Sequence, residues 1–234
     1  MMKILAIIPA RGGSKGVPRK NIKLMNGKPL LAYTAEVALE AKDLFHKIIV
    51  STEDEEIAEV AKVLGLEVPF LRPQEYASDH SASVELVRHA VLKLEELEGE
   101  KYDAVMLLQP TNPLRIKEDI VKSLEIFKNT KTDSVISVGR AISNHPAYMK
   151  KIDENGYLGP YSICEVEGTR RQDFKPYAYF RDGAVYLTKR DVIVNSNSLW
   201  GKTITPYVIP EERSVGIDTM IDWHLCEILL KQAQ

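Results

Sequence analysis

The chain has 234 residues, of which 44% are hydrophobic and 27% charged, with a formal net charge of -2 at pH 7. This length allows one large domain with a substantial core, and we expect residues 1–234 to form a single domain. A near-neutral balance argues against nucleic acid or a membrane as the partner. No segment approaches the roughly 20 apolar residues of a membrane span, and Cys164 and Cys226 fit reduced residues of a cytoplasmic protein.

Strand and helix patterns alternate along most of the chain. Strands are predicted at 4–8, 47–51, 67–71, 102–108 and 134–138, and helices at 30–41, 53–64, 81–97 and near 116–127. A strand at 184–187, a helix near 189–194, a strand at 204–209 and a closing helix at 219–231 follow. We expect the closing helix to bury Ile221, Leu225, Ile228 and Leu229. The alternation predicts βαβ units and an α/β fold with a doubly wound, mostly parallel sheet.

The alternation fails between residues 140 and 181, where prolines, glycines and short aromatic runs replace the regular pattern. Asn155-Gly156 predicts a hairpin turn between 149–152 and 157–158. We interpret this segment as a β-rich excursion inserted in the domain. His145, beside Pro146, is a candidate ligand contact within it.

A basic, glycine-rich loop at residues 7–21 follows the first predicted strand. Glycines let backbone N–H groups approach an anion, and Arg and Lys side chains add countercharge. The spacing matches neither G-x-x-x-x-G-K-[ST] nor G-x-G-x-x-G, and a plain basic surface loop is the alternative. Its place after a buried strand favours a polyphosphate site, because open α/β sheets bind ligands at the carboxyl ends of their strands. The loop contains Ala10, Arg11, Gly12, Gly13, Ser14, Lys15, Gly16, Arg19, Lys20 and Asn21.

Two other polar clusters are predicted at the same edge of the sheet. Residues 107–115 present Gln109, Thr111, Asn112 and Arg115 after the fourth strand, where Pro110 and Pro113 stiffen the turn. The alternative is that Thr111 or Asn112 caps the next helix. Residues 72–83 lead into the helix at 81–97, and their Ser and Asp side chains either cap it or hydrogen-bond to a base or ribose.

Arginines and carboxylates mark the last third of the chain. Arg170, Arg171 and Arg181 suggest an anion site, unless they form surface ion pairs with Asp173 and Asp182. Asp218 and Asp222 are four residues apart, which places both carboxylates on one face of the closing helix. Carboxylates together with substrate phosphates usually hold magnesium, so we expect Mg²⁺ here; capping of the helix by Asp218 is the alternative.

Together these clusters resemble the acylneuraminate cytidylyltransferase family. The likeness depends on A-R-G-G-S-K-G-x-P-x-K-N-I at 10–22, L-Q-P-T-x-P-L-R at 108–115, R-R-Q-D at 170–173 and S-x-x-I-D at 214–218, and it spans nearly the whole chain. It implies a Rossmann-like nucleotidyltransferase fold. It also implies a reaction in which the C2 hydroxyl of an acidic nine-carbon sugar attacks the α-phosphate of CTP and pyrophosphate leaves.

The resemblance also assigns roles to matching positions. Arg11 and Lys20 would hold the triphosphate, with Asn21 near the nucleotide, while Arg72 and Ser83 would contact cytosine. Gln109 and Tyr186 would face the sugar, Arg171 its carboxylate, and Asp218 would bind magnesium. The excursion would form a homodimer interface and reach toward the partner's active site. Phosphoryl chemistry of this kind needs positioning and charge neutralisation, and no nucleophilic side chain is required.

Two departures from the family pattern leave alternatives open. The late motif usually reads S-x-D-I-D, but Gly216 replaces the first aspartate, and Asp222 is the candidate to compensate. Asp182 replaces a usual asparagine, which suggests a negative charge near the sugar and therefore a different sugar acid as the substrate. Sialic, legionaminic and pseudaminic acids all remain candidates. The alternatives are transfer of another nucleotide such as GMP, another sugar acid, or a catalytically weak nucleotide- or sugar-acid-binding protein.

Overall fold

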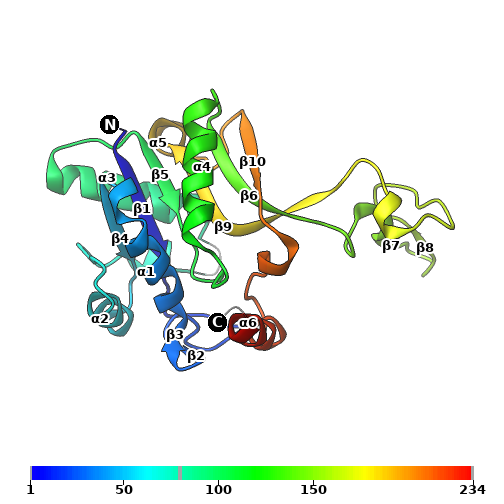
Figure 1. Cartoon of the computed structure of the whole chain (residues 1–234), viewed down its shortest axis with the longest axis horizontal. Coiled ribbons are helices and arrows are strands. Elements are labelled where there is room, and N and C mark those ends of the chain that lie inside the picture. The colour runs from blue at the N-terminus through cyan, green and yellow to red at the C-terminus, as the bar shows by residue number, and fades with distance from the viewer. Residues whose placement is uncertain (1, 79–80, 233–234) are drawn as a thin grey trace.

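Six strands form the central sheet of this computed structural model, which describes residues 2–78 and 81–232 (Figure 1). The order across the sheet is β10-β6-β9-β5-β1-β4. β1 pairs in parallel with β4 and β5, and β10 with β6, whereas β9 is antiparallel to both its neighbours. The strands are β1 (Ile4–Pro9), β4 (Lys47–Ser51), β5 (Ala104–Leu107), β6 (Ser134–Arg140), β9 (Tyr179–Lys189) and β10 (Ile204–Val208).

Helices cover both faces of the sheet, so the predicted doubly wound, mostly parallel α/β fold is confirmed (Figure 1). The apolar sides of α1, α2 and α4 pack on one face, and those of α3 and α5 on the other. A third apolar cluster lies under α6 and includes Val17, Met25, Ile217 and Trp223. The helices are α1 (Leu30–Glu40), α2 (Glu55–Val63), α3 (Ser83–Glu98), α4 (Lys117–Asn129), α5 (Arg190–Ser196) and α6 (Met220–Gln232).

One local prediction was wrong, and one small element was missed. The strand expected at 67–71 is reduced to one parallel bridge between Ile49 and Glu67, because Pro69 has no N–H with which to continue a ladder. In addition, a small hairpin that was not predicted, β2 (Leu24–Met25) and β3 (Lys28–Pro29), precedes α1. Its turn residues Asn26 and Gly27 both have positive φ, as a tight hairpin turn with right-handed strand twist requires.

The closing helix buries a different face from the one predicted. Trp223 and Cys226 are the buried residues of α6, whereas Ile221, Leu225 and Ile228 are 80%, 43% and 55% exposed. Leu229 is partly buried, as expected. Apolar residues occur around much of this helix, so periodicity alone could not select the inner face. The large indole of Trp223 has the most apolar surface to bury, and it turns the helix toward the first loop.

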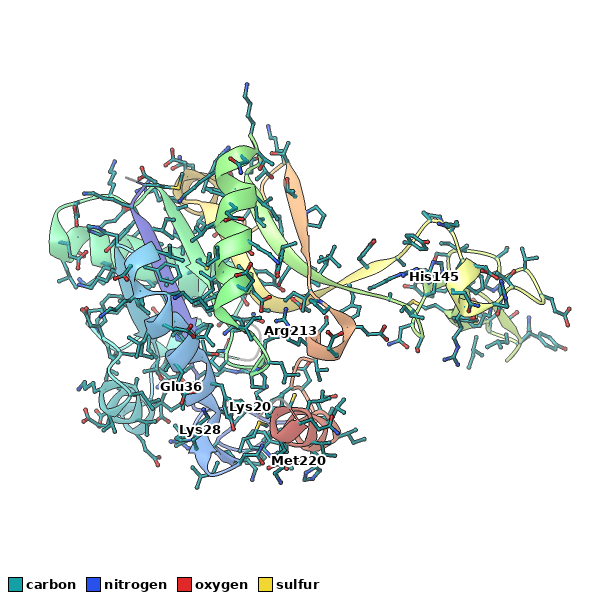
Figure 2. All side chains as sticks on the ribbon, in the orientation of Figure 1. Lys20, Lys28, Glu36, His145, Arg213 and Met220 are labelled. Carbon is teal, nitrogen blue, oxygen red and sulfur yellow. The ribbon has the colours of Figure 1, made fainter. Side chains whose placement is uncertain are left out.

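The segment between β6 and β9 projects away from the sheet (Figure 1). It contains the predicted hairpin, with β7 (Lys150–Ile152) paired antiparallel to β8 (Leu158–Pro160) and Gly156 at positive φ in the turn. His145, labelled in Figure 2, stacks on Phe174 with ring centroids 5.0 Å apart. This buried ring therefore joins the outgoing and returning parts of the excursion, far from the glycine-rich loop (Figure 2).

Candidate active site

The carboxyl ends of β1 and β5 open onto one cavity of about 380 Å³. These strands are parallel neighbours, so the loops that follow them start side by side at one edge of the sheet. The volume lies in the range of sites that hold small molecules, about 300–1,000 Å³. Eight predicted site residues line it, coming from four separate stretches of sequence: Arg11, Ser14, Lys20, Asn21, Arg72, Ser83, Gln109 and Asp218.

The glycine-rich loop is held from within and by the turn after β4. Asn21 is buried, and its Nδ2 donates to the Arg11 carbonyl at 2.9 Å, which closes the loop across its base. Arg19 has a positive φ of 53° and pairs with Asp54 and Glu56. The hydrogen bond from Arg19 is the main reason that the pKa of Asp54 is lowered. Asp54 also caps α2, accepting from the Ile57 amide. The loop is thus anchored to the start of this helix.

The segment that carries Asp218 lies directly on this loop. The Ile217 amide donates to the Thr111 carbonyl at 2.9 Å, and Lys20 Nζ donates to the Ile217 carbonyl at 2.7 Å. Figure 2 shows Lys20 near the start of α6, which Met220 marks. Burial lowers the pKa of the Lys20 ammonium, and the nearby Asp218 carboxylate partly offsets this effect. Residues far apart in sequence therefore place a cation and a carboxylate together at the cavity.

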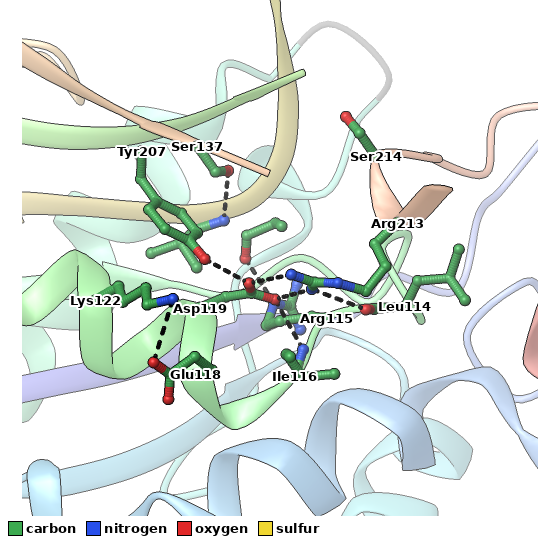
Figure 3. Close-up of polar contacts among 12 residues, drawn as sticks. Leu114, Arg115, Ile116, Glu118, Asp119, Lys122, Ser137, Tyr207, Arg213 and Ser214 are labelled. Carbon is green, nitrogen blue, oxygen red and sulfur yellow. Dashed lines mark hydrogen bonds and ion pairs between the residues drawn. The ribbon is translucent and has the colours of Figure 1, made fainter. Parts of the chain in front are cut away.

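A buried ion pair anchors the chain just before Asp218 (Figure 3). Asp119, which is fully buried in α4, accepts two bonds from Arg213, at 2.6 and 2.9 Å, and one from the Tyr207 hydroxyl at 2.8 Å. It also accepts from the Ile116 amide, so it caps α4, and neither Thr111 nor Asn112 does. Sequence reasoning missed Asp119, Arg213 and Tyr207, since nothing local marks three residues that meet only in the fold.

The cluster at 107–115 splits into cavity-lining residues and two buried anchors. Gln109, Pro110 and Thr111 line the cavity, whereas Asn112 and Arg115 are 2% and 3% exposed. Arg115 donates to the carbonyls of Gln109 and Ala184, at 2.5 and 2.6 Å, and so fixes the backbone that presents Gln109. Asn112 donates to the Asp182 carbonyl at 2.6 Å. The two anchors tie this turn to β9.

Asp182 does not direct its charge at the cavity. Its carboxylate accepts from the hydroxyls of Ser137 and Ser214, at 2.5 and 3.3 Å, and from the Ala184 amide at 3.0 Å. The residue is 8% exposed and is not among those lining the cavity. The carboxylate expected beside the sugar is thus occupied by hydrogen bonds within the protein and is not part of the cavity lining. Asp182 instead holds Ser214, the start of the late motif, against β6 and β9.

The two late carboxylates do not share a helical face. α6 begins at Met220, so Asp218 precedes the helix, whereas Asp222 lies in its first turn. Asp222 accepts from the amides of Asp218 and Thr219, at 3.0 and 2.7 Å, and from the Thr219 hydroxyl at 2.8 Å. One oxygen, Oδ2, takes all three of these bonds. Asp222, and not Asp218, therefore caps the helix. Asp218 lines the cavity instead.

The remaining predicted residues lie outside the cavity lining. Ala10, Gly12 and Gly13 belong to the same loop as Arg11. Tyr186 lies on β9, where it pairs with Leu107 of β5. Its ring packs edge-on against that of Trp200, and the Arg181 guanidinium lies 4.4 Å from the centroid of the Trp200 ring. Arg171 is exposed in the projecting excursion, in a 3-10 helix at Arg171–Asp173. Asp79 and His80, in the 72–83 stretch, lie outside the described residues.

None of the helices within residues 2–78 and 81–232 has the length and apolar character needed to span a membrane.

Comparison with known proteins identifies the family of this chain. Residues 5–194 match the family described as Cytidylyltransferase. The chain is 37% identical, over all of its length and 98% of the relative, to CMP-N,N'-diacetyllegionaminic acid synthase of Legionella pneumophila. It is 32% identical to N-acylneuraminate cytidylyltransferase of Escherichia coli, over 95% of this chain and 51% of that protein.

The fold also has solved counterparts. A CMP:2-keto-3-deoxy-manno-octonic acid synthetase complexed with CTP superposes with a TM-score of 0.71 at 17% identity, covering 99% of this chain and 100% of that one. This likeness shows the shared α/β nucleotidyltransferase architecture. The sequence matches carry the family assignment, because the family match spans most of the chain and the relatives are at least 30% identical. The chain therefore belongs to the cytidylyltransferase family, a group of nucleotidyltransferases, as its motifs indicated.

Proposed function

We propose that this protein transfers CMP from CTP to an acidic nine-carbon sugar, a nonulosonic acid, and releases pyrophosphate. The observation that carries the proposal is the convergence of eight predicted residues on one cavity. A relative that aligns over both full lengths is named for CMP-diacetyllegionaminic acid synthesis, so a legionaminic-type acid is the substrate to test first. Because CTP is an intracellular metabolite, the reaction would take place in the cytoplasm.

The triphosphate would lie on the glycine-rich loop. Arg11 and Lys20 would neutralise its charge, and Ser14 and Asn21 line the same wall. In the reaction, a bond forms between the sugar C2 oxygen and the α-phosphorus, the bond from that phosphorus to the bridging oxygen breaks, and the proton of the C2 hydroxyl passes to solvent water. The positive side chains would stabilise the charge that develops on the leaving pyrophosphate.

The two ends of the cavity would bind the base and the sugar. Arg72 and Ser83 line the base end, as the resemblance implies for cytosine. Gln109 and Tyr186 would contact the sugar, with Trp200 packed behind Tyr186. Gly183, at positive φ, lies so close to the Gln109 side chain that a Cβ there would overlap it. The Gln109 amide therefore lies directly against Gly183 of β9.

The donor set fits one loosely held magnesium ion. No group of three His, Cys, Asp or Glu side chains that could hold a metal occurs in residues 2–78 and 81–232. Asp218, which lines the cavity, would contribute one carboxylate, with substrate phosphates and water completing the shell, and Asp222 would act by fixing the Asp218 backbone. Bound there, Mg²⁺ would neutralise phosphate charge.

A homodimer would complete the sugar site. The excursion exposes apolar side chains that its own sheet does not cover, which is typical of an interaction surface. They include Ile152, Tyr157, Leu158, Tyr161 and Val166, all at least 66% exposed. Arg171 belongs to this segment, and the resemblance implies that it binds the sugar carboxylate. We propose that Arg171 acts in the partner's active site.

Pyrophosphate release tests the proposal. Purified protein with Mg²⁺ is given CTP, UTP, GTP or ATP and each of legionaminic, pseudaminic and sialic acids, with each component omitted in turn. Release that requires CTP and one sugar acid supports the proposed reaction and identifies the acceptor. Release with another nucleotide would refute the cytosine assignment. No release with any pair, while CTP still raises the melting temperature, would favour a catalytically weak binding protein. The lack of a carboxylate at Gly216 would then explain the lost activity.

A further inference from the structure

One buried carboxylate connects the glycine-rich loop to the base end of the cavity. Glu53 lies in the turn between β4 and α2, and its side chain is 8% exposed. Its Oε1 accepts from the Gly12 amide at 2.7 Å, and its Oε2 accepts from Arg72 Nη2 at 2.5 Å. Sequence reasoning did not single out Glu53.

The contact leaves Arg72 little freedom. Its side chain is 1% exposed, and its backbone amide donates to the Thr52 carbonyl at 2.7 Å. Consecutive residues, Thr52 and Glu53, therefore hold both the main chain and the guanidinium of Arg72. The Nε of Arg72 has no hydrogen-bond partner within residues 2–78 and 81–232. A guanidinium oriented before the ligand arrives loses less conformational entropy on binding.

We propose that Glu53 is a positioning residue for nucleobase selection, which it exerts by orienting Arg72. This inference rests on the proposed function, in which Arg72 contacts the base. A guanidinium only donates hydrogen bonds. Cytosine presents two adjacent acceptors, O2 and N3, whereas N3 of uracil carries a hydrogen. A fixed Arg72 therefore matches cytosine and opposes uracil, and a site built of buried polar groups discriminates strongly between such ligands.

A purely structural role for Glu53 predicts different behaviour. The ion pair is buried, so breaking it destabilises the fold whatever it does for catalysis. In that case the variants lose stability or active fraction, but the ratio of CTP to UTP use stays constant. The neighbouring Asp54 still anchors the loop through Arg19, so loss of Glu53 does not release the loop completely.

The test uses Glu53→Gln, Arg72→Gln and the double variant, with Glu59→Gln as control. Gln has the shape of Glu but sets an amide nitrogen or a neutral oxygen against Arg72. Glu59 is 70% exposed on α2 and pairs with Lys62. The measurements are kcat and KM for CTP and UTP, equilibrium binding of both nucleotides, and melting temperature. If Glu53→Gln does not fold, Glu53→Asp, one methylene too short to span both contacts, replaces it.

We expect Glu53→Gln to raise KM for CTP about tenfold and to lower the CTP preference about tenfold, with kcat changed less than about threefold. The double variant should match Arg72→Gln, because Glu53 acts through Arg72. If the wild type binds CTP and the Glu53 variant keeps the same preference for CTP over UTP, this inference is overturned while the proposed function stands. Wild type that binds neither CTP nor UTP would overturn the proposed function and this inference with it.

Discussion

Gly16 lies where the glycine-rich loop meets the late segment, and it provides the sharpest test of the site. A Cβ built on Gly16 would meet the backbone carbonyl oxygen of Asp218, well inside the 3.0 Å that Cβ atoms keep from other heavy atoms. The obstacle is backbone, so no side-chain rotation can relieve it. Gly16→Ala must therefore move the loop away from the segment that carries Asp218.

The size of the effect follows from this displacement. The overlap is relieved only when the two segments separate by about 1 Å, and misplacement of that size in an active site costs roughly 100-fold in rate. The hydrogen bond from Lys20 Nζ to the Ile217 carbonyl, 2.7 Å long, would be stretched by the same movement. The clusters on the two faces of the sheet are untouched, and overpacking at one position costs about 1–3 kcal/mol. We thus expect a large loss of kcat/KM in a folded protein.

The assay is pyrophosphate release at 25 °C, together with a thermal melt of each variant. Gly216→Ala is the matched control, since it adds the same methyl group to the late segment, where the nearest atoms lie at 3.7 and 3.9 Å. It should keep activity within about threefold, because those distances are ordinary van der Waals contacts. If Gly16→Ala retains the activity of Gly216→Ala, the close approach of loop and late segment is not needed, and our account of the site is refuted.

Three more predictions follow from the same geometry. Gly216→Asp has room for its Cβ and should lower the Mg²⁺ concentration for half-maximal activity about tenfold; an unchanged magnesium titration would show that the native site is already complete. Mixing Lys20→Ala with Arg171→Ala subunits should restore about a quarter of the sites, measured as pyrophosphate release, and no recovery after subunit exchange argues against sites shared between partners. Asp54→Asn keeps the helix cap but loses the charge that Arg19 stabilises. Because Arg19 lowers the pKa of Asp54 below 3.8, wild type should exceed the variant in urea stability at pH 7, and the gap should close as pH falls below about 4. A gap that is constant from pH 7 to 3 contradicts this linkage.

Local patterns in the sequence predicted most of the fold correctly. A buried apolar run such as 4–8 favours an inner strand of a sheet covered on both faces, and β1 does lie between β5 and β4. Asn155-Gly156 predicted its hairpin because few residues tolerate the positive φ of a tight turn. The prediction of the buried face of α6 failed, because apolar residues on several sides of the helix give its periodicity no preferred direction. The packing of Trp223 determined which face is buried.

The sequence by itself determined the chemistry of the site. Residues at 10–22, 108–115 and 214–218 carry the donors and charges that a polyphosphate needs, and their types are legible without a structure. Tertiary structure alone decided which of them meet and what holds them. Asp119 and Arg213, 94 residues apart, form one ion pair, and Glu53 reaches both Gly12 and Arg72. Such partners leave no local signal, because their energy comes from burial and geometry that exist only after the chain has folded.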